Sequence, residues 1–235
     1  NTPEDKNIPL IAALISIWNS NFLGYPAQGV IPYCSALSRL APHVQQLYME
    51  SIGKGVTRDG KFIDYPSGVI IFGEPGTNAQ HSFFQLAHQG QAFPIEFIGI
   101  INPVYQDEQA QSKGVYNHQE LWANMIAQAK ALAIGKDDDN PAKVCKGNRP
   151  SSTILVNDLS PESIGQILSF YEARTVFEGF ILGLNPFDQF GVELGKKLAT
   201  GIREQMEKKN NDAGHVFETD PATKWYLDTL YKGSL

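Results

Sequence analysis

The sequence predicts an α/β fold in which a doubly wound parallel sheet is flanked by helices. Short β-branched runs alternate with segments of helical apolar periodicity along most of the chain. Strands and helices that alternate in this way form a parallel sheet covered on both faces. The 235 residues, 42% of them apolar, can bury a sizeable core and do not require a second domain.

The expected elements alternate in chain order. The predicted strands are the apolar runs at residues 29–33, 68–73, 94–102 and 153–157. The predicted helices lie at residues 8–22, 37–50, 78–89, 118–133, 161–183, 188–208 and 222–231. Pro42 fits the second helix only if the first turn begins near it. In such sheets ligands bind at the carboxyl ends of strands. This rule points to the segments that follow the first two predicted strands.

Composition excludes several classes of protein. The formal charge is -6, from 19 Lys+Arg against 25 Asp+Glu, and argues against a nucleic-acid partner. Cys34 and Cys145 have no metal-ligand or disulfide spacing, which favours a reducing compartment. The longest apolar run, residues 8–18, is about half of a bilayer span and has no basic region before it. We therefore expect a cytoplasmic protein that does not enter a membrane.

The stretch "GEPGTNAQHSFFQLAHQG" holds two of the five histidines, His81 and His88. A helix that begins near Thr77 or Asn78 would place His81 in its first turn. There the helix dipole disfavours the imidazolium and leaves a neutral ring that can pass protons. His88 would lie nearer the other end, where a structural role suits it better. Most helix histidines are surface or core residues, and position favours His81 over His88.

Two further stretches carry candidate chemistry. In "HVQQLYMESIGKG", Gln46 and Glu50 form an i,i+4 pair on one helix face, and Gly53 is the expected stop. A carboxylate in the last turn faces the negative end of the dipole, which makes it more basic and suits a general base. The alternative is a solvated glutamate.

In "NPFDQFGVELGKK", a predicted helix places Gln189, Glu193 and Lys196 on a shared face. Gly195 beside the lysine is consistent with close approach of a ligand. An exposed helix with an ion pair between Glu193 and Lys197 explains the periodicity equally well.

Together, "YMESIGKG", "GEPGTNAQHSFFQLAHQG" and "NPFDQFGVELGK" resemble the glucose-6-phosphate isomerase (phosphoglucose isomerase) family, as do "KGNRPSS" and "IPLIAALISIW". The resemblance covers nearly the whole chain but only the C-terminal half of the family's length. It implies that residues 1–235 form the second of two sugar isomerase (SIS) domains with a C-terminal helical extension. The family's phosphate-gripping Ser/Thr loop and a catalytic arginine belong to the preceding half, so this chain alone is expected to be an incomplete enzyme.

The resemblance also implies a reaction and a set of roles. Glucose 6-phosphate and fructose 6-phosphate would be interconverted, in glycolysis and gluconeogenesis, without metal or organic cofactor. By motif match, Glu50 moves a proton between C2 and C1 through a cis-enediol, and Gln46 contacts the substrate. His81 and Lys196 assist ring opening, Lys196 also stabilises negative charge, and Gln189 is expected to reach the same ligand. The family forms homodimers in which the histidine of one subunit completes the site of the other.

The chain departs from the family's motif at one position, and two functions other than catalysis are alternatives. Ile52 stands where the family usually has Asn in "MESNGK", and it cannot make that amide's hydrogen bonds. A sugar-phosphate-sensing module would not need the glutamate, histidine and lysine together. A secreted signalling role, with which the family is also associated, leaves no mark in the sequence.

Overall fold

The computed structural model describes residues 2–105 and 110–234. The chain divides into two compact units, Asn1–Phe187 and Asp188–Leu235. The first unit contains the sheet and most of the helices, and the second contains two helices and their connections. The assignment of the whole chain to one SIS domain with an extension stays a prediction.

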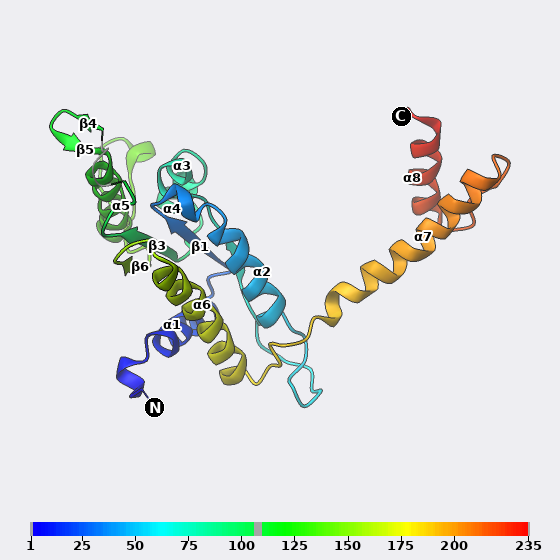
Figure 1. Cartoon of the computed structure of the whole chain (residues 1–235), viewed down its shortest axis with the longest axis horizontal. Coiled ribbons are helices and arrows are strands. Elements are labelled where there is room, and N and C mark those ends of the chain that lie inside the picture. Colours follow the sequence, from blue (N-terminus) through cyan, green and yellow to red (C-terminus); the bar gives the residue numbers. More distant parts are fainter. Residues whose placement is uncertain (1, 106–109, 235) are drawn as a thin grey trace. The chain divides into compact units, whose positions relative to one another are not determined.

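The first unit is built on four parallel strands in the order β2-β1-β3-β6 (Figure 1). These strands are β1 (Ala27–Pro32), β2 (Ile70–Phe72), β3 (Ile95–Ile100) and β6 (Ser151–Val156). The predicted parallel sheet is therefore confirmed: β2 and β3 lie within the apolar runs that predicted them, and β1 and β6 overlap theirs but begin two residues earlier. An additional hairpin joins β4 (Gln111–Ser112) to β5 (Val115–Tyr116), which no apolar run indicated.

Helices cover both faces of the sheet. They are α1 (Ile8–Ile17), α2 (Leu40–Ile52), α3 (Gly76–Gln80), α4 (Phe84–Gln89), α5 (Asn117–Ile134) and α6 (Pro161–Ile181). Short helical turns complete the unit: η1 (Glu4–Lys6), η2 (Trp18–Phe22), η3 (Ser35–Leu37) and η4 (Pro141–Lys143). Pro42 lies in the first turn of α2, as its missing N–H requires. The second unit holds η5 (Phe190–Val192), α7 (Glu193–Asn211) and α8 (Pro221–Lys232).

Two apolar cores lie on the two faces of the sheet because successive strand side chains point in opposite directions. Val30 of β1 packs into the core beneath α2 and α6, whereas its neighbour Ile31 packs into the core beneath α3, α4 and α5. On β3, Ile98 and Phe97 divide in the same way. The sheet is thus packed on both faces. Loops and helix ends lie at its two remaining sides, the amino edge where the parallel strands begin and the carboxyl edge where they end.

Candidate functional site

Gln46 and Glu50 lie together on α2. Glu50 is in the last turn, as the sequence predicted, and the helix stops at Gly53, whose N–H donates to the carbonyl oxygen of Met49 at 3.1 Å. Gln46 is exposed and Glu50 is half-buried. One turn apart on the same helix, the two side chains can reach one ligand.

The opposite face of α2 packs on the sheet. Its buried side chains are Leu40, Ala41, Val44, Tyr48 and Ile52. Ile52 is fully buried in the same core as Val30 and Ile71. The departure from the family's usual asparagine therefore places an aliphatic side chain in an apolar core, where it packs without leaving a polar group unsatisfied.

The direction of α2 relative to β2 follows from its neighbours at two glycines. A Cβ on Gly73, just after β2, would lie 3.1 Å from the Cβ of Ala41 in the first turn of α2. A Cβ on Gly68, before β2, would lie 3.5 Å from the carbonyl carbon of Ile52 at the other end. The helix thus runs antiparallel to β2, and Glu50 lies at the edge of the sheet where the strands begin.

His81 lies at the opposite edge. Instead of one helix over residues 78–89, the structure has two short helices, and His81 directly follows the last residue of α3. The prediction of a helix first turn is therefore wrong, and the dipole argument for a neutral imidazole does not apply. The neighbouring Gln80 donates to the hydroxyl of Tyr33 at 2.8 Å, just past the end of β1. His81 itself is exposed.

Packing of two consecutive aromatic residues explains the break. Phe83 stacks edge-on against Phe72 of β2, with ring centroids 4.9 Å apart, while Phe84 is buried near Phe97 of β3. Phe83 has φ -124° and ψ 2°, outside the helical range, so the backbone leaves the helix at the first of these two rings. Tertiary packing therefore overrides the helical pattern between α3 and α4.

The two predicted residues are consequently far apart within one chain. Nine residues of helix separate Ala41, which neighbours Gly73, from Glu50, and at about 1.5 Å per residue this is roughly 13 Å. His81 lies beyond the strand end that Gly73 marks, and α2 runs away from α3 in Figure 1. One copy of the chain does not bring Glu50 and His81 together.

The second unit carries the remaining two candidates. Lys196 lies in the first turn of α7 and is exposed. Gln189 precedes η5 with φ -149°, outside α7, so the predicted helical face shared with Glu193 is wrong for Gln189. The proline and glycines around this segment delay the helix by five residues relative to the sequence expectation.

His88 has the structural role that its position suggested. Its Nε2 lies 2.8 Å from the side-chain oxygen of Gln128 on α5, and its ring packs on Phe84 at 5.9 Å. The contacts hold α4 against α5.

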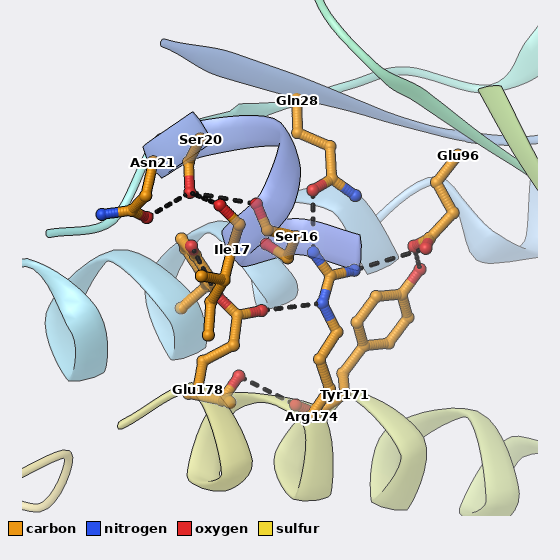
Figure 2. A network of polar contacts seen from close by, with 11 residues as sticks. Ser16, Ile17, Ser20, Asn21, Gln28, Glu96, Tyr171, Arg174 and Glu178 are labelled. Atoms are coloured by element: carbon orange, nitrogen blue, oxygen red, sulfur yellow. Dashed lines mark hydrogen bonds and ion pairs between the residues drawn. The ribbon is translucent and has the colours of Figure 1, made fainter. Parts of the chain in front are cut away.

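A buried polar network lies beneath α2 and was not identified from the sequence (Figure 2). Arg174 of α6 donates from Nε to Glu178 at 3.0 Å, from one terminal nitrogen to Glu96 of β3 at 3.3 Å, and from the other to Gln28 of β1 at 2.8 Å. The hydroxyl of Tyr171 donates to Glu96 at 2.5 Å. All five side chains are buried. Glu96, a charged residue inside the otherwise apolar run "IEFIGI", was the sequence signal for this network.

Burial and charge shift the pKa values in the network. Burial acts to lower the pKa of Arg174, but the carboxylates of Glu96 and Glu178 outweigh it and hold that pKa above its ordinary value. Burial raises the pKa of Glu178, and Arg174 opposes the rise. Burial also raises the pKa of Tyr48, whose hydroxyl stays protonated and donates to Glu178 at 2.9 Å.

A groove of about 860 Å³ opens between α1, β6 and α6. Its lining includes Gln28, Glu96 and Arg174 but none of the five predicted site residues. Within residues 2–105 and 110–234, no group of three or more His, Cys, Asp or Glu side chains is arranged to hold a metal ion. In the same ranges no helix combines the length and apolarity that a membrane crossing needs.

Comparison with known proteins extends these observations. A glucose-6-phosphate isomerase of Desulfosudis oleivorans is 66% identical over 229 residues, which cover 97% of this chain and 42% of the relative. The cytosolic glucose-6-phosphate isomerase of Arabidopsis thaliana is 45% identical, over 97% of this chain and 43% of its own. The crystal structure of a glucose-6-phosphate isomerase from Chlamydia trachomatis superposes with a TM-score of 0.86 at 42% identity, over 98% of this chain and 43% of that one.

The chain therefore spans less than half the length of these relatives. The family model for phosphoglucose isomerase matches residues 1–224, almost the entire chain. The resemblance carried by the three motifs is confirmed, and the chain belongs to the phosphoglucose isomerase family.

Proposed function

We propose that the protein containing this chain is an aldose-ketose isomerase that interconverts glucose 6-phosphate and fructose 6-phosphate. Family membership and the names of the relatives support this reaction. Because the chain spans less than half of those relatives, the activity belongs to the whole protein. The cytosol is the proposed compartment, supported by the name of the plant relative, and the reaction would serve glycolysis and gluconeogenesis.

In this proposal Glu50 is the base. Its carboxylate takes the proton from C2 of the open-chain aldose and returns it to C1 of the cis-enediol, while Gln46, one turn earlier, contacts the substrate. His81 and Lys196 assist ring opening, and the ammonium of Lys196 also stabilises negative charge that develops on the sugar oxygen. Gln189 contacts the same ligand. No metal or organic cofactor takes part.

The observation that carries the proposal is the separation of Glu50 and His81. A base and a ring-opening residue must both come within hydrogen-bond reach of atoms of one sugar. Since the two lie at opposite edges of the sheet in one copy, the active unit is a homodimer in which His81 of one copy completes the site around Glu50 of the other. A two-fold axis then generates two equivalent sites.

Mixed dimers test this arrangement. Full-length Glu50→Ala and His81→Ala proteins are denatured together, refolded and assayed for conversion of fructose 6-phosphate. About half of the randomly paired dimers are mixed, and one of their two sites contains neither substitution. Activity per subunit should therefore approach roughly a quarter of the wild-type value.

Glu50→Ala mixed with Gln46→Ala is the matched control. Both residues belong to the same helix, so every site in a mixed dimer keeps one defect and no activity should be gained. A Glu50→Ala and His81→Ala mixture that contains mixed dimers but is no more active than its parents would refute the shared site. A wild-type protein that binds the sugar phosphates without turnover would instead identify the sensing module and refute the isomerase.

A further inference from the structure

Tyr48 occupies the position between the two proposed site residues of α2. A residue two positions away on a helix projects about 200° around the axis, so Tyr48 points away from both Gln46 and Glu50. Its side chain is buried, with 2% of its surface exposed, whereas Gln46 is exposed and Glu50 half-buried. Whatever holds Tyr48 therefore determines which way the opposite face of the helix points.

Polar contacts, as well as apolar ones, hold Tyr48. Its hydroxyl donates to Oε2 of Glu178 at 2.9 Å, and the other oxygen of Glu178 accepts from Nε of Arg174 at 3.0 Å. Figure 2 shows the guanidinium of Arg174 between Glu178, Gln28 and Glu96, which come from α6, β1 and β3. The chain of contacts thus connects α2, through two side chains of α6, to the two central strands of the sheet.

Hydrogen bonds have narrow geometry, and a buried polar group that loses its partner is costly. The network therefore favours one rotation of α2 about its axis, where apolar packing alone would tolerate small rotations. A rotation of about 20° would move a carboxylate that lies roughly 6 Å from the axis by about 2 Å. Displacements of this size are large for catalysis, since about 1 Å can reduce a rate by about two orders of magnitude.

We propose that Tyr48, Glu178 and Arg174 are positioning residues for the isomerase reaction, which orient α2 so that Glu50 meets C2 of the sugar. The inference rests on the proposed function and extends it to residues that do not touch the substrate. They act through the helix, by fixing the direction in which the base approaches the C–H bond.

The test compares two tyrosines in full-length protein. Tyr48→Phe removes the hydroxyl that contacts Glu178, and Tyr171→Phe removes a hydroxyl that is equally buried and contacts Glu96. Tyr171 belongs to α6, and its hydroxyl reaches Arg174 only through Glu96, at the side of the network away from α2, so it is the matched control. Each variant is measured for kcat, KM, thermal midpoint and the kinetic isotope effect with substrate deuterated at C2.

Tyr48→Phe should lower kcat about tenfold, leave KM within about twofold and increase the isotope effect, because a displaced base makes proton transfer more rate-limiting. Tyr171→Phe should lower the thermal midpoint similarly and leave kcat and the isotope effect close to wild type. Glu178→Gln provides a second measurement if Tyr48→Phe does not fold, with kcat reduced severalfold and the isotope effect again increased.

An unchanged kcat and isotope effect in the folded variants of Tyr48 or Glu178 would overturn the inference, as would an equal loss of kcat in Tyr171→Phe. Either result leaves the proposed reaction intact, because wild-type activity is measured separately. A wild type without isomerase activity would remove the proposed function and this inference with it.

Discussion

Replacing Arg174 by methionine tests how far the first unit depends on its buried cation. Methionine has a similar length and no charge, so Arg174→Met removes the hydrogen bonds to Glu178, Glu96 and Gln28 with little change in packing. The side chains of Glu96 and Glu178 are 5% and 1% exposed, so little water reaches either carboxylate in the folded chain. Both carboxylates lose the buried cation that faces them.

Removal of one partner from a buried ion pair typically destabilises a protein by about 3–5 kcal/mol. We expect a loss of this size in the free energy of the local opening that exposes β3 and α6. At about 1.4 kcal/mol per factor of ten, the amides of these elements should exchange roughly 150- to 5,000-fold faster. Hydrogen exchange read by mass spectrometry measures this directly in the assembled protein, without requiring reversible global unfolding.

The loss of stability in Arg174→Met should depend on pH in one direction. Burial already raises the pKa of Glu178, and loss of Arg174 removes the charge that opposes the rise. A carboxyl whose pKa is higher in the folded chain than in the unfolded chain binds more protons when folded. Its stabilising contribution is therefore present at low pH and is lost as the pH rises through the raised pKa. The deficit of Arg174→Met should be largest near pH 8 and smaller near pH 5.

Arg58→Met is the matched control. The Arg58 side chain is 71% exposed, and its contact with Asp59 is 3.8 Å long, so its loss should change local stability by less than about 0.5 kcal/mol. Exchange in Arg174→Met that is within a few-fold of wild type at pH 8, or a deficit that grows as the pH falls, would refute the reasoning.

Two further substitutions test the placement of α2 and α6. Gly73→Ala should destabilise the unit by about 1–3 kcal/mol or more, because its Cβ would lie 1.9 Å from the carbonyl oxygen of Val30. Gly55→Ala, with open space at its Cβ, is the control and should be nearly neutral when amide hydrogen exchange is measured in both variants. Hydrogen bonds from Ser160, then from the Ser163 hydroxyl, lower the pKa of Asp158. The ionised carboxylate therefore stabilises the start of α6 fully above the ordinary carboxyl pKa. This stabilisation is lost as the pH falls through the lowered pKa of the folded chain. Exchange at the α6 N-terminus should thus be faster in Asp158→Asn than in wild type at pH 6, and the difference should shrink as the pH falls below the ordinary carboxyl pKa. A difference that grows as the pH falls would contradict this cause.

Periodicity predicted the elements whose local pattern agrees with their packing. The run "GVIIFG" became β2, and α2 places its buried residues Val44, Tyr48 and Ile52 where the helical spacing requires. The break at His81 could not be predicted in this way, because it depends on where Phe72 and Phe97 lie in the folded sheet. The polar network was missed for the same reason: its members are distant in sequence and meet only when β1, β3 and α6 pack together.

The motifs predicted which residues belong to the candidate site, but they did not predict where each residue lies in the folded chain. The rule that ligands bind at the carboxyl ends of strands suits His81, which follows β2. It does not suit Glu50, because a helix that follows a parallel strand returns along the sheet and ends where the next strand begins. The order of elements alone thus assigns Glu50 and His81 to opposite edges. The homodimer that we propose would bring the amino edge of one sheet against the carboxyl edge of another, and its two-fold axis would do this twice.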